Sequence, residues 1–425
     1  MTPEGWRQLA LSEAAEVNPA RFLERGTSAP FIEMAAVHEE SPRVRYLLKR
    51  SFDGGGARFT NGDTLLARIT PCAENGKTAL VTQLASNATV AFGSTEFIVL
   101  APRDRLSIPE FIYFTAKRES VRSVLVSRMV GTSGRQRIPN SALDEIVIGV
   151  PPLPEQRKIA AILSSVDGAI EASQAVIDQI QVVKKAMMAE LLTKGLPGRH
   201  KKFKQTEIGQ MPLEWMVCTI DSLGMNAEAT VRSGPFGSSM KTKDFVASGV
   251  PVLTIQSLGH GELLREGLFY VSNEKARELA EYKVRPNDVV FSRVADIGRC
   301  AAISREEDGW LISPNLSRIR LDPGKADARF LMYLITNGAS VLRQVEMVAG
   351  NAGRPVISST TLKELRLPVP ELPEQHAIAA AGQELEQRLT AERQYLIQLQ
   401  DTKFALMSVL LTGEVRVRVD EDAAA

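Results

Sequence analysis

One stretch of this sequence occurs twice and constrains the fold more than any other. Residues 153–192 return as residues 372–411, at a constant offset of 219. In both copies apolar residues recur at steps that alternate between four and three, which is the heptad pattern of a coiled coil. Both copies begin with Leu-Pro-Glu-Gln and are followed by threonine and glycine, which are start and stop signals of a helix. A helix of roughly 40 residues is about 60 Å long, so each copy is expected to need a partner helix.

The residues at the heptad seam predict how the two helices pair. An antiparallel pairing with Lys184 opposite Glu392 joins a cation to a carboxylate, places Ser173 opposite Lys403, and lets neighbouring apolar residues meet. A parallel pairing in matching register would place Lys184 against Lys403, two ammonium groups in a partly buried seam. We therefore expect an antiparallel intramolecular pair; the alternative is two amphipathic helices packed on separate domains. The predicted seam contains Ile170, Ile177, Ile180, Lys184, Met187, Leu389, Glu392, Leu396, Leu399 and Leu406.

Composition limits the kinds of function that the chain can have. Its 425 residues are enough for two or three domains with cores of their own. With 51 basic and 50 acidic residues, the net charge is +1 and does not indicate a particular kind of partner. A nucleic-acid site would therefore have to be formed by local clusters of basic residues. Three scattered cysteines and four histidines show no ligand spacing, so neither a disulfide framework nor a metal site is expected. Without a signal-peptide or membrane-length apolar run, we expect a cytoplasmic chain that does not enter a membrane.

The globular parts of the chain repeat as well. Short β-branched runs, turn residues and one helix predicted over 108–129 indicate an α+β domain before the first long helix. Trp6 is then echoed by Trp215 and Arg68 by Arg293, and residues 131–161 match residues 350–380 at 15 of 31 positions. We expect an α+β fold in which two similar domains are separated by two long antiparallel coiled-coil helices. The expected boundaries are 1–150 for the first domain, 151–196 for the first helix, 197–369 for a linker and the second domain, 370–413 for the second helix, and 414–425 for a tail.

Two loops of the first domain concentrate polar and basic side chains. The loop 68–77 follows a predicted strand, and the loop 131–137 combines small residues with two arginines. Arginine and lysine neutralise phosphates, while arginine and asparagine can hydrogen-bond base edges through two atoms. The alternative for both loops is an ordinary solvated turn. The candidate DNA-facing residues of this domain are Arg68, Thr70, Asn75, Lys77, Arg135 and Arg137.

The middle of the second domain differs from that of the first and has candidate loops of its own, at 233–243 and 292–299. A shared frame with divergent middles is expected if each half binds something different. We expect Phe236, within the first of these loops, to anchor the core rather than to be exposed. The basic run 199–204 in the predicted linker 194–210 is expected to be a solvated tether. The candidate DNA-facing residues of this domain are Ser238, Ser239, Lys241, Lys243, Arg293, Arg299 and Arg354.

Taken together, these features resemble the specificity subunit of Type I restriction-modification systems. The resemblance covers nearly the whole chain and rests on the segments 146–161 and 365–380, the twin heptad helices, the sequence Ile-Gly-Gln-Met-Pro-Leu-Glu-Trp at 208–215 and the Gly-Pro-Phe-Gly loop at Gly234. It implies two target-recognition domains, each of which recognises one half of a bipartite double-stranded DNA sequence.

The resemblance also implies partners. The paired helices would hold the two domains apart and dock two modification (methyltransferase) subunits, which bind S-adenosylmethionine and methylate adenine. Restriction subunits would complete the cleaving complex, and this chain itself would bind no cofactor.

The chemistry that the sequence lacks agrees with a subunit that is not catalytic. We find no Asn-Pro-Pro-aromatic segment, no glycine-rich cofactor fingerprint between a strand and a helix, no P-loop, and no paired carboxylates with lysine at nuclease spacing. We therefore assign no catalytic residue and no metal ligand. Two other classes stay open from the sequence: a self-sufficient DNA-modifying enzyme with an unusual site, and a coiled-coil scaffold that does not bind DNA.

Overall fold

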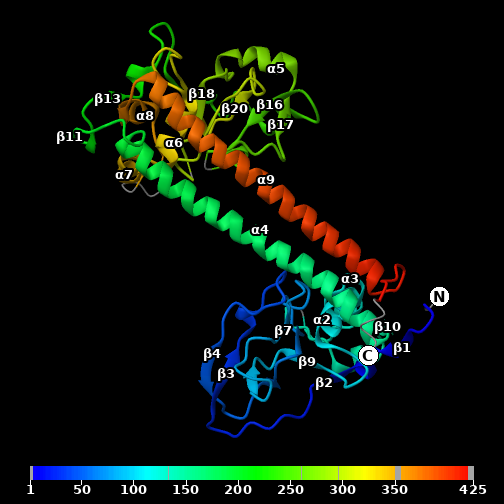
Figure 1. Ribbon diagram of the computed structural model, residues 1–425. Coiled ribbons are helices and arrows are strands. Elements are labelled where there is room, and N and C mark those ends of the chain that lie inside the picture. Colours follow the sequence, from blue (N-terminus) through cyan, green and yellow to red (C-terminus); the bar gives the residue numbers. More distant parts are fainter. Residues whose placement is uncertain (1–2, 133, 260, 295, 350–355, 420–425) are drawn as a thin grey trace. The chain divides into compact units, whose positions relative to one another are not determined.

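The computed structural model describes residues 3–132, 134–259, 261–294, 296–349 and 356–419, and it divides into two compact units (Figure 1). Unit 1 comprises Met1–Val176 and Glu392–Ala425, and unit 2 comprises Ile177–Ala391. Two long helices, α4 (Leu153–Lys194) and α9 (Leu372–Leu410), each contribute one half to each unit. Each unit therefore combines a globular head with the adjoining halves of both helices.

The head of unit 1 is built on two four-stranded sheets. The first has the order β2-β9-β6-β7 and the second the order β4-β3-β8-β5. In the first sheet, alternate residues face opposite sides, as the pleat of a strand requires. Leu66, Ile98 and Leu100 lie in the core shared with the helices, whereas Leu65 and Val99 lie in the core between the sheets. The strands are β2 (Ala15–Val17), β3 (Ser28–Ile32), β4 (Leu48–Ser51), β5 (Ala57–Phe59), β6 (Thr64–Ala67), β7 (Thr78–Leu80), β8 (Ala91–Gly93) and β9 (Phe97–Pro102).

Two helices cover the sheet β2-β9-β6-β7, where the sequence predicts a single helix over 108–129. They are α2 (Pro109–Lys117) and α3 (Glu119–Ser127). The break falls at Arg118, whose backbone is not helical (φ −57°, ψ 133°). Its guanidinium donates a hydrogen bond to the carbonyl of Leu411 at 3.2 Å. No glycine or proline marks the break in the sequence around Arg118, and the prediction of one continuous helix is wrong.

The head of unit 2 repeats this plan. Its first sheet has the order β14-β21-β18-β19 and its second the order β15-β17-β16-β20. Val289, Phe291 and Ile319 face the core beneath helix α6 (Ala328–Asn337), while Val290 and Leu316 face the second sheet. The strands are β14 (Val231–Ser233), β15 (Phe245–Val246), β16 (Val250–Leu253), β17 (Phe269–Val271), β18 (Asp288–Ser292), β19 (Cys300–Ala302), β20 (Leu311–Ile312) and β21 (Leu316–Arg320).

Short elements connect the heads to the long helices. The antiparallel ribbon of β1 and β10 leads into α4, and the ribbon of β13 and β22 leads into α9. The predicted linker 194–210 contains the first strand of a hairpin, formed by β11 and β12, in which Thr206 Oγ1 donates to the carbonyl of Gly209 at 2.7 Å. These elements are β1 (Arg7–Ala10), α1 (Leu11–Ala14), β10 (Val147–Val150), β11 (Phe203–Thr206), β12 (Gly209–Pro212), β13 (Met216–Thr219), α5 (Asn273–Glu278), α7 (Ala339–Ala349), α8 (Ser359–Glu364) and β22 (Arg366–Val369).

The two long helices pack against each other in antiparallel fashion (Figure 1), which confirms the predicted direction. In unit 1, Lys403 Nζ lies 2.5 Å from Asp167 Oδ1. In unit 2, Lys184 Nζ lies 2.6 Å from Glu386 Oε1. Every predicted seam residue is buried or half-buried. The heptad pattern therefore marks the contact face of both helices correctly.

The predicted register of this pair is wrong by about one heptad. Lys184 meets Glu386 rather than Glu392, and Lys403 meets Asp167 rather than Ser173. Ser173 instead donates a hydrogen bond to Glu392 at 2.7 Å. Asp167 and Glu386 lie beside the a and d positions of the seam. The predicted register was chosen by pairing a and d residues only, so it did not take these two carboxylates into account. The observed register supplies a carboxylate to both lysines, whereas the predicted one would leave Lys403 with a serine hydroxyl.

Candidate nucleic-acid interface

The two candidate loops of unit 1 meet in space. Ile138 N donates to the carbonyl of Arg68 at 2.8 Å, and Thr70 N donates to that of Gln136 at 3.1 Å. Residues 68–70 and 136–138 therefore run side by side, with an antiparallel bridge between positions 69 and 137. The structure thus brings Arg68, Thr70 and Arg137 together at the start of β9.

The side chains of this group differ in what they can offer a ligand. Arg137 is engaged by Glu96 through two bonds, Nε to Oε2 at 2.9 Å and Nη2 to Oε1 at 2.7 Å. The hydrogen bond raises the pKa of Arg137 and lowers that of Glu96. Arg68 Nη2 donates to the carbonyl of Ile138 at 2.7 Å, and its buried Nε has no hydrogen-bond partner. Arg135 is exposed, so it is the cation of this group best placed to meet a phosphate.

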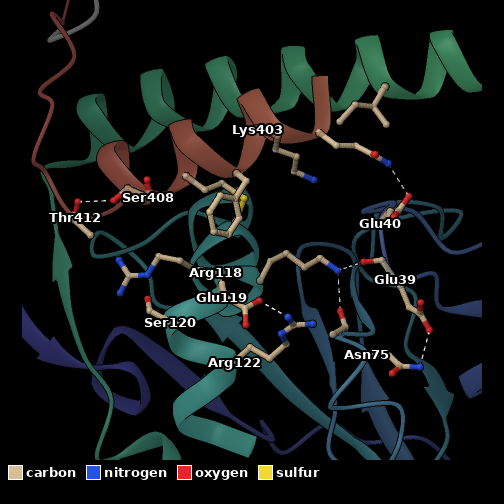
Figure 2. Close-up of a pocket in the computed structure, with 16 residues that line it drawn as sticks. Glu39, Glu40, Asn75, Arg118, Glu119, Ser120, Arg122, Lys403, Ser408 and Thr412 are labelled. Carbon is tan, nitrogen blue, oxygen red and sulfur yellow. Dashed lines mark hydrogen bonds and ion pairs between the residues drawn. The ribbon is translucent and has the colours of Figure 1, made fainter. Parts of the chain in front are cut away.

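The side chains of Asn75 and Lys77 make contacts of their own in unit 1. Asn75 Nδ2 donates to Glu39 Oε1 at 3.0 Å, and Lys77 Nζ lies 3.4 Å from the carbonyl of Met34. Asn75 lines a cavity of about 760 Å³ that also includes residues of α3 and the C-terminal half of α9 (Figure 2). The side chains of both candidates therefore point to other partners than the group around Arg68, although the carbonyl of Lys77 accepts a hydrogen bond from the N–H of Ala67, next to Arg68, at 3.0 Å.

The cavity in Figure 2 is lined by cations that the protein itself engages. Lys117 Nζ donates to the carbonyl of Gly76 at 2.7 Å and to that of Glu39. Burial lowers the pKa of Lys117 to about 8, with a smaller contribution from Lys403. These bonds tie the turn 71–76 to α2. Within the described part of the chain, no group of three histidine, cysteine or acidic side chains is arranged to hold a metal ion.

The loop of unit 2 that begins at Gly234 is held close to its sheet. Gly234 N donates to the carbonyl of Leu316 at 2.8 Å, and a Cβ at this position would lie 2.0 Å from the carbonyl oxygen of Ser313. Only glycine can make so close an approach. Further along, Ser238, Lys241 and Lys243 are exposed, and Ser239 is half-buried. The exposed lysines of this loop are therefore free to meet a polyanion.

The expectation that Phe236 anchors the core is wrong. Its side chain is 82% exposed, while Pro235 and Met240 in the same loop are buried. The sequence contains three apolar residues here, and only the path of the loop decides which of them point inward. Composition alone could not distinguish them.

Arg293 takes the place in unit 2 that Arg68 takes in unit 1. Ile357 N donates to the carbonyl of Arg293 at 2.9 Å, just as Ile138 N donates to that of Arg68. Arg293 also keeps a buried Nε without a hydrogen-bond partner. Arg299 is engaged by Asp296, whose Oδ2 lies 2.6 Å from its Nε. The remaining candidate, Arg354, lies outside the residues that the structure describes.

A pair of buried carboxylates was missed by the sequence reasoning. In unit 1, Glu155 Oε2 accepts a hydrogen bond from Trp6 Nε1 at 3.0 Å and its Oε1 accepts one from Arg416 Nε at 2.7 Å. Glu155 comes from the first turn of α4, whereas Arg416 follows the end of α9. One carboxylate therefore joins the head, one long helix and the segment after the other.

Unit 2 contains the equivalent carboxylate, Glu374, in the first turn of α9. It accepts hydrogen bonds from Trp215 Nε1 at 3.2 Å and from His200 Nε2 at 2.8 Å. His200, with Arg199 at 3.5 Å from the same carboxylate, belongs to the basic run that was expected to be solvated. The repeated Leu-Pro-Glu-Gln and the repeated tryptophan were the signal for this site. A buried glutamate needs donors and a cation.

The comparisons agree on the class of protein. Residues 8–182 and 235–400 match the family described as Type I restriction modification DNA specificity domain. The match covers most of the chain, so the chain belongs to this family.

Two curated relatives come from Methanocaldococcus jannaschii. The chain is 26% identical over 329 residues to the "Type I restriction enzyme MjaVIII specificity subunit", a match that covers 76% of this chain and 74% of the relative. It is also 26% identical over 364 residues to the "Putative type I restriction enzyme MjaX specificity subunit", with 85% and 80% covered.

Solved structures share the fold. A chain from the structure titled "Structural basis underlying complex assembly and conformational transition of the type I R-M system" aligns with a TM-score of 0.60 at 17% identity, and the alignment covers 98% of this chain and 100% of that one. The Type I restriction-modification system S subunit from M. genitalium aligns with a TM-score of 0.56 at 14% identity, with 96% of each chain covered. No helix of the described residues is long and apolar enough to cross a membrane.

Proposed function

We propose that this chain is the specificity subunit of a Type I restriction-modification complex and that each unit recognises one half of a bipartite DNA sequence. The observation that carries the proposal is the duplicated head: each unit has a four-stranded first sheet of equivalent strand order, and each head is joined through a buried glutamate to the long helices. The first sheets and the glutamate sites agree between the units, whereas the second sheets differ at their edges and the exposed loops differ in sequence. Two similar scaffolds with different loops suit the recognition of two different half-sites.

The exposed cations are the first candidates for contacts with DNA. Arg135 in unit 1 and Lys241 and Lys243 in unit 2 are exposed, and such side chains bind phosphates and make the affinity depend on salt. Arg68 and Arg293 each hold a buried Nε without a partner, which suits a role in positioning the loops against bases or backbone. We also propose that the remaining residues predicted from the sequence contact DNA. They are Thr70, Asn75, Lys77, Arg137, Ser238, Ser239, Arg299 and Arg354.

The reactions themselves would be carried out by partner subunits. We infer that the complex contains methyltransferase subunits, two in number, that bind S-adenosylmethionine and methylate adenine, and that restriction subunits join it for cleavage. This chain would bind no cofactor and supply no catalytic residue. The names of the relatives, which are specificity subunits of restriction enzymes, support this division of labour.

A binding and turnover experiment tests the proposal. The chain would be purified alone and with its methyltransferase subunits, and both preparations would be assayed for DNA binding by gel shift and for methyl transfer and cleavage with S-adenosylmethionine and a divalent metal. We expect sequence-specific binding and methylation from the complex only. Turnover by the chain alone would favour a self-sufficient enzyme, and a complex that never shifts DNA would favour a scaffold.

A further inference from the structure

The head of unit 2 contains a small pocket whose side chains are mostly basic. Its volume is about 290 Å³, and it is formed by residues of β14 and β21 and by the segments 227–229 and 280–285. A pocket of this size lies at the lower end of the range of small-molecule sites, roughly 300–1,000 Å³. Five cations line it: Arg232, Lys283, Arg285, Arg318 and Arg320.

The carboxylates around this pocket are already engaged by some of these cations. Glu228 lies 2.6 Å from Arg320 and 3.1 Å from Arg285, and Glu281 pairs with Arg232. Asp288 is bonded by the guanidinium of Arg320 through both of its oxygens at 2.9 Å. Five cations therefore face three carboxylates, which leaves the pocket with a net charge of +2.

Arg318 is the buried cation that has no carboxylate of its own. Its side chain is only 4% exposed, and its Nη1 donates to the carbonyls of Glu281 and Lys283, each at 3.0 Å. Its buried Nε has no hydrogen-bond partner, because the nearest oxygen of Asp288 lies 4.0 Å away. Burial and the neighbouring Arg320 lower the pKa of Arg318 to about 10, so it stays charged at neutral pH. A buried charge of this kind is costly unless an anion compensates it.

Unit 1 shows that the fold does not require this excess of charge. Asp63 corresponds to Asp288, since each stands at the start of its strand and accepts a 2.8 Å hydrogen bond from the N–H three residues earlier. Asp63 is neutralised by one arginine, Arg21, at 2.6 Å.

The residues of unit 1 that correspond to the two buried arginines are apolar. Strand β9 holds the place of β21, and the positions 219 residues before Arg318 and Arg320 are Val99 and Ala101. Both of these residues are buried. The same sheet therefore forms without a buried cation at this place, which indicates that Arg318 serves a ligand rather than the fold.

We propose that this pocket of unit 2 binds the terminal phosphate of a small anion, such as inorganic phosphate, pyrophosphate or a nucleotide. A terminal phosphate carries a charge of about −1.5 to −2 at pH 7, which matches the net charge of the pocket. The planar guanidinium of Arg318 has further N–H donors beyond those of Nη1, and guanidinium groups bind phosphate oxygens in pairs.

The observations favour a small anion over the DNA backbone. A phosphate of the DNA backbone carries a single charge and is flanked by a sugar on each side, so it suits an open groove better than a pocket of about 290 Å³. The inference does not depend on the proposed recognition of DNA.

Isothermal titration calorimetry of the full chain with inorganic pyrophosphate tests the proposal. At constant ionic strength we expect saturable binding of one pyrophosphate per chain. Arg318→Val should weaken this binding by about tenfold or more, because it removes charge-assisted hydrogen bonds. Arg366→Gln provides the control, since it removes an exposed arginine of unit 2 that pairs with Glu207 away from the pocket. This variant should bind pyrophosphate as the wild-type chain does.

Urea unfolding separates a ligand site from a structural ion-pair network. Without phosphate, Arg318→Val should be at least as stable as the wild-type chain, because valine occupies the corresponding place in unit 1 and the repulsion from Arg320 is relieved. Pyrophosphate should raise the unfolding midpoint of the wild-type chain but not that of the variant. An Arg318→Val chain that is less stable without phosphate, in a protein that pyrophosphate does not stabilise, would show that Arg318 supports only the fold.

Two further outcomes would also overturn the proposal. Pyrophosphate binding that Arg318→Val leaves unchanged would place the anion elsewhere on the chain. A complex in which Arg318→Val weakens DNA binding and lowers its salt slope by about one, without any binding of pyrophosphate, would assign the pocket to a backbone phosphate. A complex that does not bind DNA refutes the proposed function but leaves the pyrophosphate result to decide this site.

Discussion

Glu155 and Glu374 occupy equivalent places in the two units but are neutralised by different cations. The guanidinium of Arg416 serves Glu155, and it stays charged at every physiological pH. The imidazole of His200 serves Glu374, and it can lose its proton near neutrality. Arg199, 3.5 Å from Glu374, stays charged as well, so the site in unit 2 keeps part of its positive charge at high pH, but only this site contains a cation that titrates.

We predict that the stability of unit 2 depends on the protonation of His200, whose side chain is only 4% exposed. Burial acts to lower its pKa, but hydrogen bonds to Glu374 and Glu214 outweigh burial, and the net pKa is raised. A raised pKa in the folded state means that the stabilisation is fully present below the unfolded-state value of about 6.5. It is lost as the pH rises through the higher, folded-state value.

Urea unfolding at about pH 6 and about pH 8.5 measures this dependence. The wild-type chain should lose more stability between the two conditions than the His200→Asn variant does. Arg416→Gln provides the comparison in unit 1, because it removes the equivalent cation without removing a titrating group. An identical loss in the wild-type chain and in the His200 variant would contradict the assignment.

At this scale the sequence predicted the repeated backbone positions but not the direction of every side chain. Arg68 and Arg293 are equivalent, as their shared surroundings indicated. Phe236 was expected inside and lies outside, because Pro235 and Met240 fill the buried places. The buried site at Glu155 was not predicted, because its partner Arg416 comes from a distant part of the chain. Long-range pairing of this kind has no local signature.

At the scale of elements, the paired helices show what periodicity can and cannot predict. Burial of one face produces the heptad pattern, so the contact faces and the direction of pairing were recovered. The register depends on side chains that flank the seam, such as Asp167 and Glu386, which the pattern of apolar residues ignores. The segment that forms α2 and α3 was likewise predicted as one helix, because no glycine or proline marks the break at Arg118.

The observed register predicts strong coupling between Asp167 and Lys403. Both are buried, and their charged atoms lie 2.5 Å apart. Lys403→Met alone should cost about 3 kcal/mol because it leaves a buried carboxylate without its cation. The double variant Asp167→Leu with Lys403→Met should recover most of this loss.

A double-mutant cycle by chemical denaturation measures the coupling. The control is the pair Ser173→Ala and Lys403→Met. These two residues would contact each other, and so be coupled, in the register predicted from the seam. They do not contact each other in the observed register, so their effects should be additive. Additive effects for Asp167 and Lys403, with coupling between Ser173 and Lys403, would show that the observed register is not the one in solution.

At the scale of the whole molecule, the proposal is that a single chain carries two recognition heads and that the paired helices set the spacing of the half-sites they recognise. The duplicated heads and the pairing of α4 with α9 were both foreseen from the repeats, because a duplicated sequence must bury the same residues twice. The bases that each head recognises were not foreseen, since they depend on loops that differ between the copies. The loops at 68–77, 131–137 and 233–243 identify chemistry but not sequence preference.

The central claim is tested most directly by mapping methylated adenines after shortening the helices. One heptad would be deleted from α4 and the opposed heptad from α9, in a complex otherwise unchanged. Removal of seven residues shortens a helix by about 10 Å, which corresponds to roughly three base pairs of B-DNA. We predict the same two half-sites with a spacer shorter by that amount. An unchanged spacer, or methylation that follows no bipartite sequence in the unmodified complex, would contradict the account.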